Sequence, residues 1–320
     1  MEQPAPAGVV GTARRVETAG RLEPGLVARV FELVEAAAEA DDVRPLSEHV
    51  TLHLRHGGEA PDVHLLAFDD DGEIAGYAHV DPTDAVAGAS VELVVHPAAR
   101  RRGHATALVQ AALEATPDGR LRLWAHGDSP AARALAARLG LHVGRRLEQW
   151  RRSLFSPLPR LELPDGVRLR AFRPGADDAE WLALNARAFA GHPEQGAWTE
   201  ADLRARMAED WFDPEGFLLA EEDGPAGPRL VAFHWTKVHG ADGHGHDPIG
   251  EVYVVGVDPA AQGRGLGRAV TLAGLHRLRA LALPQAMLYV EGDNEPAKAT
   301  YRRLGFSHWD TDVMFYRGPA

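Results

Sequence analysis

The sequence predicts a mixed α/β protein made of two similar halves. The stretch DPAAQGRGLG, residues 258–267, has a near twin in HPAARRRGHA, residues 96–105, and the two copies lie 258 − 96 = 162 residues apart. Strand-like and helix-like segments follow one another in the same order around both copies. Because the chain has 320 residues, it is long enough for two domains of ordinary size. A repeat of about half the chain is the simplest interpretation.

Three strands are expected before each copy of the motif. In the first half, segments 64–68 and 73–80 flank the turn sequence DDDG and predict a β-hairpin, and the apolar segment 90–95 predicts the strand that enters the motif. The matching segments of the second half are 216–223, 229–239 and 250–257.

A helix, a short strand, a second helix and a last strand are expected after each copy. In the second half the first helix is indicated by Leu272, Leu275, Leu278 and Ala282, which recur at steps of three and four residues. The later elements are expected at 120–127, 129–140 and 141–150, and again at 286–293, 295–305 and 307–317.

The boundary between the halves is expected in residues 153–166. Three prolines and a Pro-Asp-Gly turn interrupt the pattern there. We place the boundary near Pro159, which gives expected domains of residues 1–158 and 159–320.

Composition excludes several classes of function. The formal charge of 34 − 46 = −12 disfavours a surface for DNA or RNA. The chain has no cysteine, which excludes disulfides, thiolate metal sites and a cysteine nucleophile. It has no long apolar span, and its N-terminus lacks the pattern of a signal peptide. We therefore expect a cytoplasmic monomer without membrane or nucleic-acid partners.

The glycine-rich segment QGRGLG is expected to lead from a strand into a helix. Such a turn offers free backbone N–H groups and the positive end of the helix dipole, which suit a pyrophosphate. One copy alone is a weak signal, because many such turns carry glycines for steric reasons. A dinucleotide-binding fold is disfavoured, since the glycines follow a β-hairpin and not the first strand of a series of βαβ units.

The context of this loop resembles the GCN5-related N-acetyltransferase (GNAT) superfamily. The spacing Gln/Arg-x-x-Gly-x-Gly/Ala is similar to its acyl-CoA loop, and NEPAKATYRRLGF at 294–306 is similar to its Asn-x-x-Ala-x-x-x-Tyr-x-x-x-Gly-Phe signature. The resemblance implies two tandem GNAT domains, each with a mixed, mostly antiparallel sheet flanked by helices, and acetyl-CoA as cosubstrate. The residues that it implies for acetyl-CoA binding are Val255, Gly256, Val257, Gln262, Gly263, Arg264, Gly265, Leu266, Gly267, Arg268, Asn294, Glu295, Pro296, Ala297, Lys298 and Ala299, and in the first half Leu93, Val94, Val95, Arg101, Arg102, Gly103, His104, Ala105 and Thr106.

Acetyl transfer to an amine needs a base, donors for the oxyanion and a donor for the departing thiolate. Glu251 can be the base, or a strand-end carboxylate in solvent. Backbone N–H groups of 255–257 can receive the carbonyl oxygen if the strand is splayed or bulged, which Gly256 permits. Tyr301 can direct its hydroxyl at the CoA sulfur, or pack as an aromatic residue. Asn294 is expected to cap the helix, with Pro296 in the first turn.

The first half lacks this catalytic pair. At the offset of 162 the partner of Glu251 is Ala89, and Tyr301 aligns with Ala136 or Leu135, depending on the end from which the helix is counted. We expect an inactive half that either binds CoA, with Arg100–Arg102 at the phosphates, or is structural and builds one wall of the substrate site of the second half.

Segments 188–199, 233–239 and 250–267 closely resemble the mycothiol synthase family of actinobacteria. That family transfers acetyl from acetyl-CoA to the cysteinyl amine of a cysteine-glucosamine-inositol conjugate. The resemblance makes Glu251 the base and Tyr301 the acid. It also places five residues near the substrate, namely Glu48, Glu194, Lys237, Glu251 and Tyr289.

Interpretations of these residues without a role in function stay open. Glu48 and Glu194 can be solvated surface, and Lys237 can protect a strand edge. The histidines of loop 240–248 suggest a metal only weakly, and no metal site is expected. The alternative functions are a non-catalytic tandem acetyl-CoA-binding protein and an acetyltransferase for another amine, such as an aminoglycoside or a protein N-terminus.

Overall fold

The computed structural model describes residues 15–57, 62–83, 88–116, 119–191, 193–224, 227–240 and 248–318. Its chain divides into two compact units. Unit 1 comprises Met1–Arg145 and Asp312–Ala320, and unit 2 comprises Arg146–Thr311. Among the helices of the described ranges, none is both long and apolar enough to cross a bilayer.

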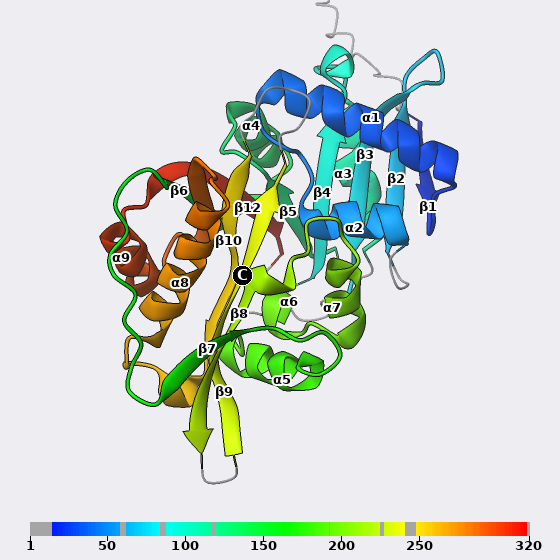
Figure 1. Cartoon of the computed structure of the whole chain (residues 1–320). Helices are drawn as coiled ribbons and strands as arrows, with labels where there is room; N and C mark the ends of the chain where they lie inside the picture. The colour runs from blue at the N-terminus through cyan, green and yellow to red at the C-terminus, as the bar shows by residue number, and fades with distance from the viewer. Residues whose placement is uncertain are drawn as a thin grey trace, which may run out of the picture. The chain divides into compact units, whose positions relative to one another are not determined.

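Unit 1 is a mixed sheet with helices on both faces (Figure 1). Its strand order is β1-β2-β3-β4-β5-β12, in which β4 and β5 are parallel and the other neighbours antiparallel. Its strands are β1 (Val16–Ala19), β2 (Val63–Phe68), β3 (Ile74–Asp81), β4 (Ala89–Val95), β5 (Leu121–Ala125) and the later part of β12 (Ser307–Arg317). Its helices are α1 (Pro24–Asp41), α2 (Glu48–His56), the 3₁₀ turn η1 (Pro97–Ala99), α3 (His104–Glu114) and α4 (Pro130–Arg138).

Unit 2 repeats this topology in the order β7-β8-β9-β10-β11-β6. Its one parallel pair among the described strands is β10 with β11. Its strands are β7 (Val167–Ala171), β8 (Phe217–Gly224), β9 (Gly227–His239), β10 (Ile249–Val257), β11 (Gln285–Glu291) and most of β6 (His142–Ser153). Its helices are α5 (Asp178–Ala188), α6 (Pro193–Gly196), α7 (Glu200–Met207), η2 (Pro214–Gly216), η3 (Pro259–Ala261), α8 (Leu266–Ala280) and α9 (Glu295–Arg303). The predicted fold class, with mixed and mostly antiparallel sheets, is confirmed.

The last strand of each half lies in the unit built by the other half. β6 follows the first half, yet it pairs with β11 from Leu147 to Ser153. β12 ends the second half, yet residues 313–317 pair with β5. Val313 and Phe315 join the core of unit 1, and Trp150 joins a core of unit 2. The repeat predicted at 1–158 and 159–320 and the compact units are thus different divisions of the chain.

Alternation along the strands sends side chains into separate cores. In unit 1, Leu65 and Ala78 face α3 and α4, and their neighbours Leu66 and Tyr77 face α1 and α2. In unit 2, α8 and α9 cover one face, and α5 and α7 cover the other (Figure 1). The predicted leucines of α8 are fully buried, but the helix ends at Ala280, so that Ala282 lies beyond it with a φ of 59°.

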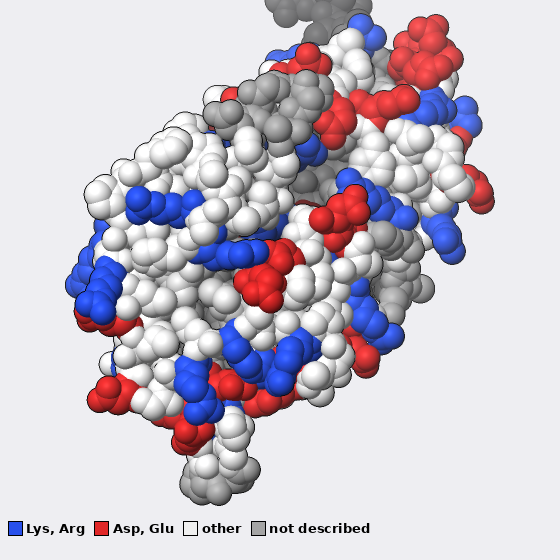
Figure 2. All heavy atoms as spheres, viewed as in Figure 1, with Lys and Arg blue, Asp and Glu red and all other residues white. Residues whose placement is uncertain are grey.

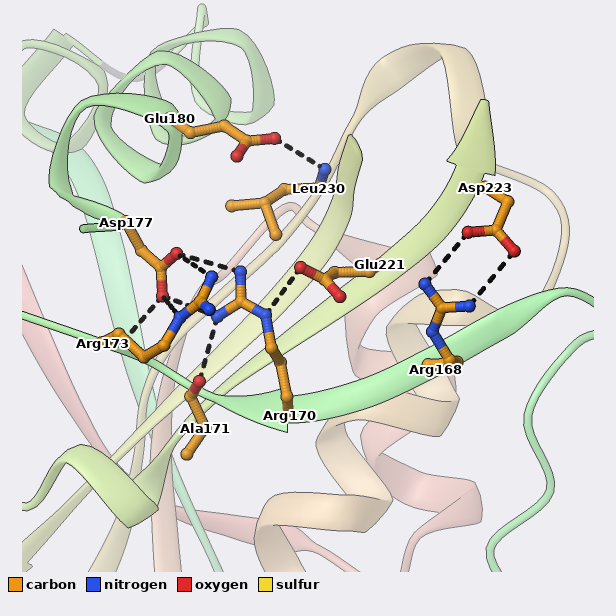
Figure 3. Close-up of polar contacts among 9 residues, drawn as sticks. All are labelled: Arg168, Arg170, Ala171, Arg173, Asp177, Glu180, Glu221, Asp223 and Leu230. Atoms are coloured by element: carbon orange, nitrogen blue, oxygen red, sulfur yellow. Dashed lines mark hydrogen bonds and ion pairs between the residues drawn. The ribbon is translucent and has the colours of Figure 1, made fainter. Parts of the chain in front are cut away.

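The guanidinium group of Arg170 on the edge strand β7 donates charge-assisted hydrogen bonds to two carboxylates (Figure 3). Arg170 donates to both oxygens of Asp177, at 2.6 and 3.0 Å, and to Glu221 on β8 at 2.6 Å. Asp177 is buried, which opposes its charge, but hydrogen bonds from Arg170 and Arg173 lower its pKa to about 2. This planar bidentate pairing joins the start of α5 to the edge of the sheet.

Candidate active site

Strand β10 pairs with its two neighbours over different lengths. It pairs with β9 from Ile249 to Val257, but with β11 only from Ile249 to Val252. In an antiparallel pair, alternate residues direct their N–H groups away from the partner strand. Some N–H groups of 254–257 therefore point away from β9, on the side where the described part of β11 no longer pairs. The separation of β10 from a neighbouring strand, which was expected near 255–257, is therefore present.

The bulge in β10 lies at Tyr253, where the register with β9 shifts between Val252 and Val254. The expectation that Gly256 permits the bulge is wrong. Gly256 stays in register opposite Phe233, and a Cβ at this position would lie 2.4 Å from the Phe233 ring. The glycine therefore makes room for a buried aromatic ring.

The glycine loop of unit 2 leads into α8 as predicted. Asp258 begins η3 by accepting from the Ala260 N–H at 2.9 Å, and Arg187 holds its carboxylate at 2.9 and 3.1 Å. Gly263 and Gly265 have φ angles of 78° and 82°, which favour glycine. Gly265 is the N-cap of α8 and has no capping side chain, so the first-turn N–H groups donate no hydrogen bond to an N-cap side chain.

The twin in unit 1 has the same local structure. His96 begins η1 by accepting from the Ala98 N–H at 3.2 Å, and Gly103 is the N-cap of α3 with a φ of 94°. Arg101 has a φ of 64° and is exposed. The resemblance of the two motifs thus extends to their backbone conformations.

The expected acetyl-CoA residues lie at corresponding places of the two units. In unit 2 they are the end of β10 (255–257), the loop and start of α8 (262–268) and the start of α9 (294–299). In unit 1 they are the end of β4 (93–95) and the loop and start of α3 (101–106).

Two basic side chains of this set already have partners. Arg264 pairs with Glu222 at 2.6 Å. Lys298 is buried and contacts Glu148 at 3.2 Å and Glu295 at 2.8 Å. On the face of the molecule that Figure 2 shows, basic and acidic side chains are likewise mixed.

Glu251 is a buried carboxylate, 7% exposed. Its Oε2 lies 2.7 Å from Nε2 of His239, whose side chain is 34% exposed. Lys237 is directly opposite Glu251 on β9, and its Nζ lies 4.6 Å from the centre of the Trp211 ring and 5.4 Å from that of Tyr253. The interpretation of Glu251 as a solvated strand-end group is wrong, because strand pairing buries it between Lys237 and Met287.

Tyr301 lies on α9, and its ring packs against Phe306 with 5.9 Å between centroids. Burial raises the pKa of its hydroxyl to about 12. The predicted cap of the same helix is confirmed, because Asn294 accepts from the Ala297 N–H at 3.1 Å and Pro296 lies in the first turn. Tyr301 therefore keeps its proton throughout the physiological pH range.

The other expected substrate residues are found at three places. Glu48 is the first residue of α2 in unit 1. Tyr289 on β11 is 40% exposed, and its hydroxyl accepts from Gln149 Nε2 at 2.8 Å. Glu194 lies in α6, and its side chain lies outside the described part of the chain. The loop histidines, His244 and His246, also lie outside the described residues.

Strand register identifies the counterparts of the catalytic pair in unit 1. Because β4 pairs with β3 without the extra residue that β10 has at Tyr253, Glu251 corresponds to Ser90 and not to Ala89. The N-caps Ser129 and Asn294 set the offset of the last helices, so Tyr301 corresponds to Ala136. Neither counterpart has a carboxylate or a phenol.

Sequence reasoning missed His239, Tyr253 and Trp211. His239 and Lys237 are two residues apart on one strand and so share a face with Glu251. The two-residue spacing of Lys237 and His239 is visible in the sequence. It identifies them as neighbours of Glu251 only when the register of β9 against β10 is known.

A family model described as Acetyltransferase (GNAT) family matches residues 28–141 and 180–306. These matches cover more than half of the chain, and the chain therefore belongs to the GNAT acetyltransferase family. The family uses acetyl-CoA, so the predicted class of enzyme, an acetyl-CoA-dependent N-acetyltransferase, is confirmed.

Two relatives are similar over almost the whole chain. The mycothiol acetyltransferase of Acidothermus cellulolyticus is 57% identical and covers 97% of each chain. That of Streptosporangium roseum is 55% identical over 94% of this chain and 98% of its own. The predicted resemblance to the mycothiol synthase family is thereby confirmed. A solved tandem GNAT protein from the clavulanic acid biosynthesis pathway has a TM-score of 0.71 at 20% identity, covers 96% of this chain and 100% of its own, and supports the fold.

Proposed function

We propose that this chain transfers acetyl from acetyl-CoA to the cysteinyl amine of desacetylmycothiol, 1-D-myo-inositol 2-(L-cysteinylamino)-2-deoxy-α-D-glucopyranoside. The names of the two full-length relatives support this acceptor. The observation that carries the chemistry is the buried carboxylate of Glu251, next to the segment where β10 leaves β11.

Glu251 acts as the base in this proposal. An α-amine is mostly an ammonium ion near neutral pH, so it must lose a proton before it can attack. Glu251 takes this proton, directly or through a water, and the amine nitrogen then forms a bond to the thioester carbonyl carbon. His239 touches Glu251 and is partly exposed, and it can relay the proton to solvent.

Backbone and Tyr301 stabilise the two developing negative charges. N–H groups of 254–257 that point away from β9 donate to the carbonyl oxygen as it becomes an oxyanion. When the carbon–sulfur bond breaks, the thiolate leaves with the electron pair, and the Tyr301 hydroxyl donates a hydrogen bond to it. A phenol with a pKa of about 12 is a weaker acid than a thiol near 8.5, so Tyr301 stabilises the thiolate more than it gives up its proton.

Charged and polar groups suit the polyhydroxylated acceptor. We propose that Lys237, Glu194 and Tyr289 contact its hydroxyl groups. The role expected for Glu48, which lies in unit 1, stays a prediction. Lys237 is 8% exposed and lies over two aromatic rings, which fix the position of its ammonium group. Hydrogen-bond donors and carboxylates of this kind can orient a substrate that has several hydroxyl groups.

We further propose that unit 1 has no catalytic activity, since Ser90 and Ala136 stand at the catalytic positions. Its glycine loop still has the conformation of a phosphate-binding turn. Titration of the chain with CoA tests whether unit 1 binds it. Two binding sites per chain indicate that unit 1 binds CoA, and one site indicates that unit 1 is structural. The cytoplasmic location and the monomeric state stay predictions.

The test is a mass-spectrometric assay with acetyl-CoA and desacetylmycothiol beside simple amines. We expect the pseudo-disaccharide to be acetylated on nitrogen with the highest kcat/KM, and Glu251→Gln to lose about 10²- to 10⁴-fold in kcat with little change in acetyl-CoA affinity. Preference for a simple amine would refute the acceptor, and a wild-type rate in Glu251→Gln would refute the base.

A further inference from the structure

Three side chains of unit 1 converge between α2 and the β2–β3 hairpin. His53 lies on α2, Asp62 directly precedes β2, and His79 lies on β3. One nitrogen or oxygen atom of each lies within 4.8 Å of the other two. Asp62 Oδ2 is 2.5 Å from His53 Nδ1 and 3.4 Å from His79 Nε2. This convergence depends on the register of the hairpin, in which His64 pairs with His79.

Within the part of the chain that the structure describes, two polar atoms of this cluster are buried without a hydrogen bond. They are Oδ1 of Asp62 and Nε2 of His79. Asp62 is 6% exposed and His79 is 1% exposed. A buried polar atom without a partner costs about 1–3 kcal/mol and is uncommon in folded proteins. The ion pair between His53 and Asp62 accounts for Oδ2 but leaves both of these atoms unexplained.

A divalent cation bound to Nε2 of His79 and to both carboxylate oxygens of Asp62 would satisfy both atoms. Two imidazoles and a carboxylate are ligands that zinc and its neighbours prefer, whereas calcium and magnesium prefer oxygen ligands alone. Around a tetrahedral zinc with bonds near 2.0–2.1 Å, the ligand atoms lie about 3.3 Å apart. The separation of 3.4 Å between Asp62 and His79 already matches this value. The shorter contact of His53 would open when the metal replaces the hydrogen bond.

The surroundings of the cluster also suit a cation. His49 lies one turn before His53, with 4.0 Å between ring centroids, and its Nε2 is 3.6 Å from Asp81. The ring of His64 lies near that of His79, tilted by 55° with 5.5 Å between ring centroids. The side chain of His53 is 22% exposed, which gives an ion access from solvent.

We propose that His53, Asp62 and His79 bind one divalent first-row transition ion, with zinc as the expected metal. The ion would link α2 to the β2–β3 hairpin, and so fix the helix whose first residue is Glu48. Three protein ligands leave a fourth position for water. The proposal is independent of the acetyl-transfer mechanism, which uses no residue of this cluster.

The test is a titration of the full, untagged chain with Co²⁺ after treatment with a chelator. We expect visible absorption of a low-symmetry Co²⁺ site that saturates at one equivalent, is displaced by one equivalent of Zn²⁺, and is accompanied by a higher unfolding temperature. His53→Gln changes a partly exposed ligand and should fold normally by circular dichroism. It should weaken Co²⁺ binding at least about tenfold, since even outer-shell partners of metal sites contribute that much.

His308→Gln is the matched control, because His308 is an exposed histidine of unit 2 that lies outside the cluster. It should bind Co²⁺ like the wild type. Absence of a saturable Co²⁺ spectrum in the wild type would overturn the proposal. Equal Co²⁺ affinity of His53→Gln and wild type would also overturn it.

Discussion

Nε2 of His239 lies 2.7 Å from Oε2 of Glu251, although twelve positions of the chain separate the two residues. The antiparallel pairing of β9 with β10 puts Lys237 opposite Glu251, and His239 is two residues further along the same face. Glu251 therefore has the buried Lys237 as its cross-strand neighbour and contacts the partly exposed imidazole of His239. The contact orients the proposed base, and the partly exposed His239 can pass the proton from Glu251 to solvent.

His239→Gln should lower kcat about tenfold, because Glu251 keeps its place on the strand but loses the partner that orients it and relays its proton. The affinity for acetyl-CoA should not change. A role in structure alone would lower stability without changing the shape of the pH–rate profile. We therefore expect a profile that differs from that of the wild type, measured beside His308→Gln, which should match the wild type. An unchanged profile and rate in His239→Gln would show that the contact is not used.

Tyr301→Phe should lower kcat about 10- to 100-fold with a smaller effect on KM, since only the departing thiolate needs the hydroxyl. Burial raises the pKa of this hydroxyl to about 12, so the donor form persists well above neutral pH. The pH–rate profile of the wild type should consequently show no loss from tyrosine ionisation up to about pH 10. Stopped-flow release of CoA measures both effects. A fall in rate near pH 9 that disappears in Tyr301→Phe would contradict the assignment.

Gly265→Ala and Gly267→Ala form a matched pair in one loop. Gly265 has a φ of 82°, where a side chain costs about 1–2 kcal/mol. A Cβ at Gly267 would make an ordinary 3.5 Å contact with Val257, and the twin has Ala105 at this position. We expect acetyl-CoA affinity to fall about 5- to 30-fold in Gly265→Ala and within about twofold of wild type in Gly267→Ala. Equal affinities in calorimetry would show that the loop conformation does not matter for the cosubstrate.

His126 connects the exchanged strand β12 to unit 1. Its ring is 3.0 Å from Asp312 and 3.4 Å from Glu92, and Gly127 N–H donates to Asp312 at 2.8 Å. Burial of the ring opposes its charge, but the hydrogen bonds to both carboxylates raise the pKa of His126 to about 10. Removing one partner of such a buried group costs about 3–5 kcal/mol. His126→Gln should destabilise unit 1 by an amount in this range at neutral pH.

The pH dependence of unfolding follows from the same contact. Because the folded pKa lies above the unfolded value near 6.5, the stabilisation is complete below about pH 6.5 and is lost as the pH rises toward about 10. Urea unfolding of the wild type should show this decline, and His126→Gln should show a flatter curve over the same range. Asp312→Asn should behave like His126→Gln. A wild-type slope in both variants would contradict the link.

Local patterns in the sequence determined much of this protein. The twin glycine motifs, the hairpins before them, and the cap at Asn294 depend on a few consecutive residues, and the structure has them where they were predicted. The family and its cosubstrate follow from the same motifs. These features are local because turn conformation and capping depend on φ, ψ and nearby side chains.

Only the tertiary structure decided which strand completes each sheet. The last strands of the two halves have similar patterns and occupy equivalent places, so the sequence does not tell whether β6 joins β5 or β11. The bulge at Tyr253, the correspondence of Glu251 with Ser90, and the contacts of His239 and of the His53 cluster likewise depend on strand register. Register is set by long-range pairing and packing, and a shift of one residue moves every side chain of a strand to the other face.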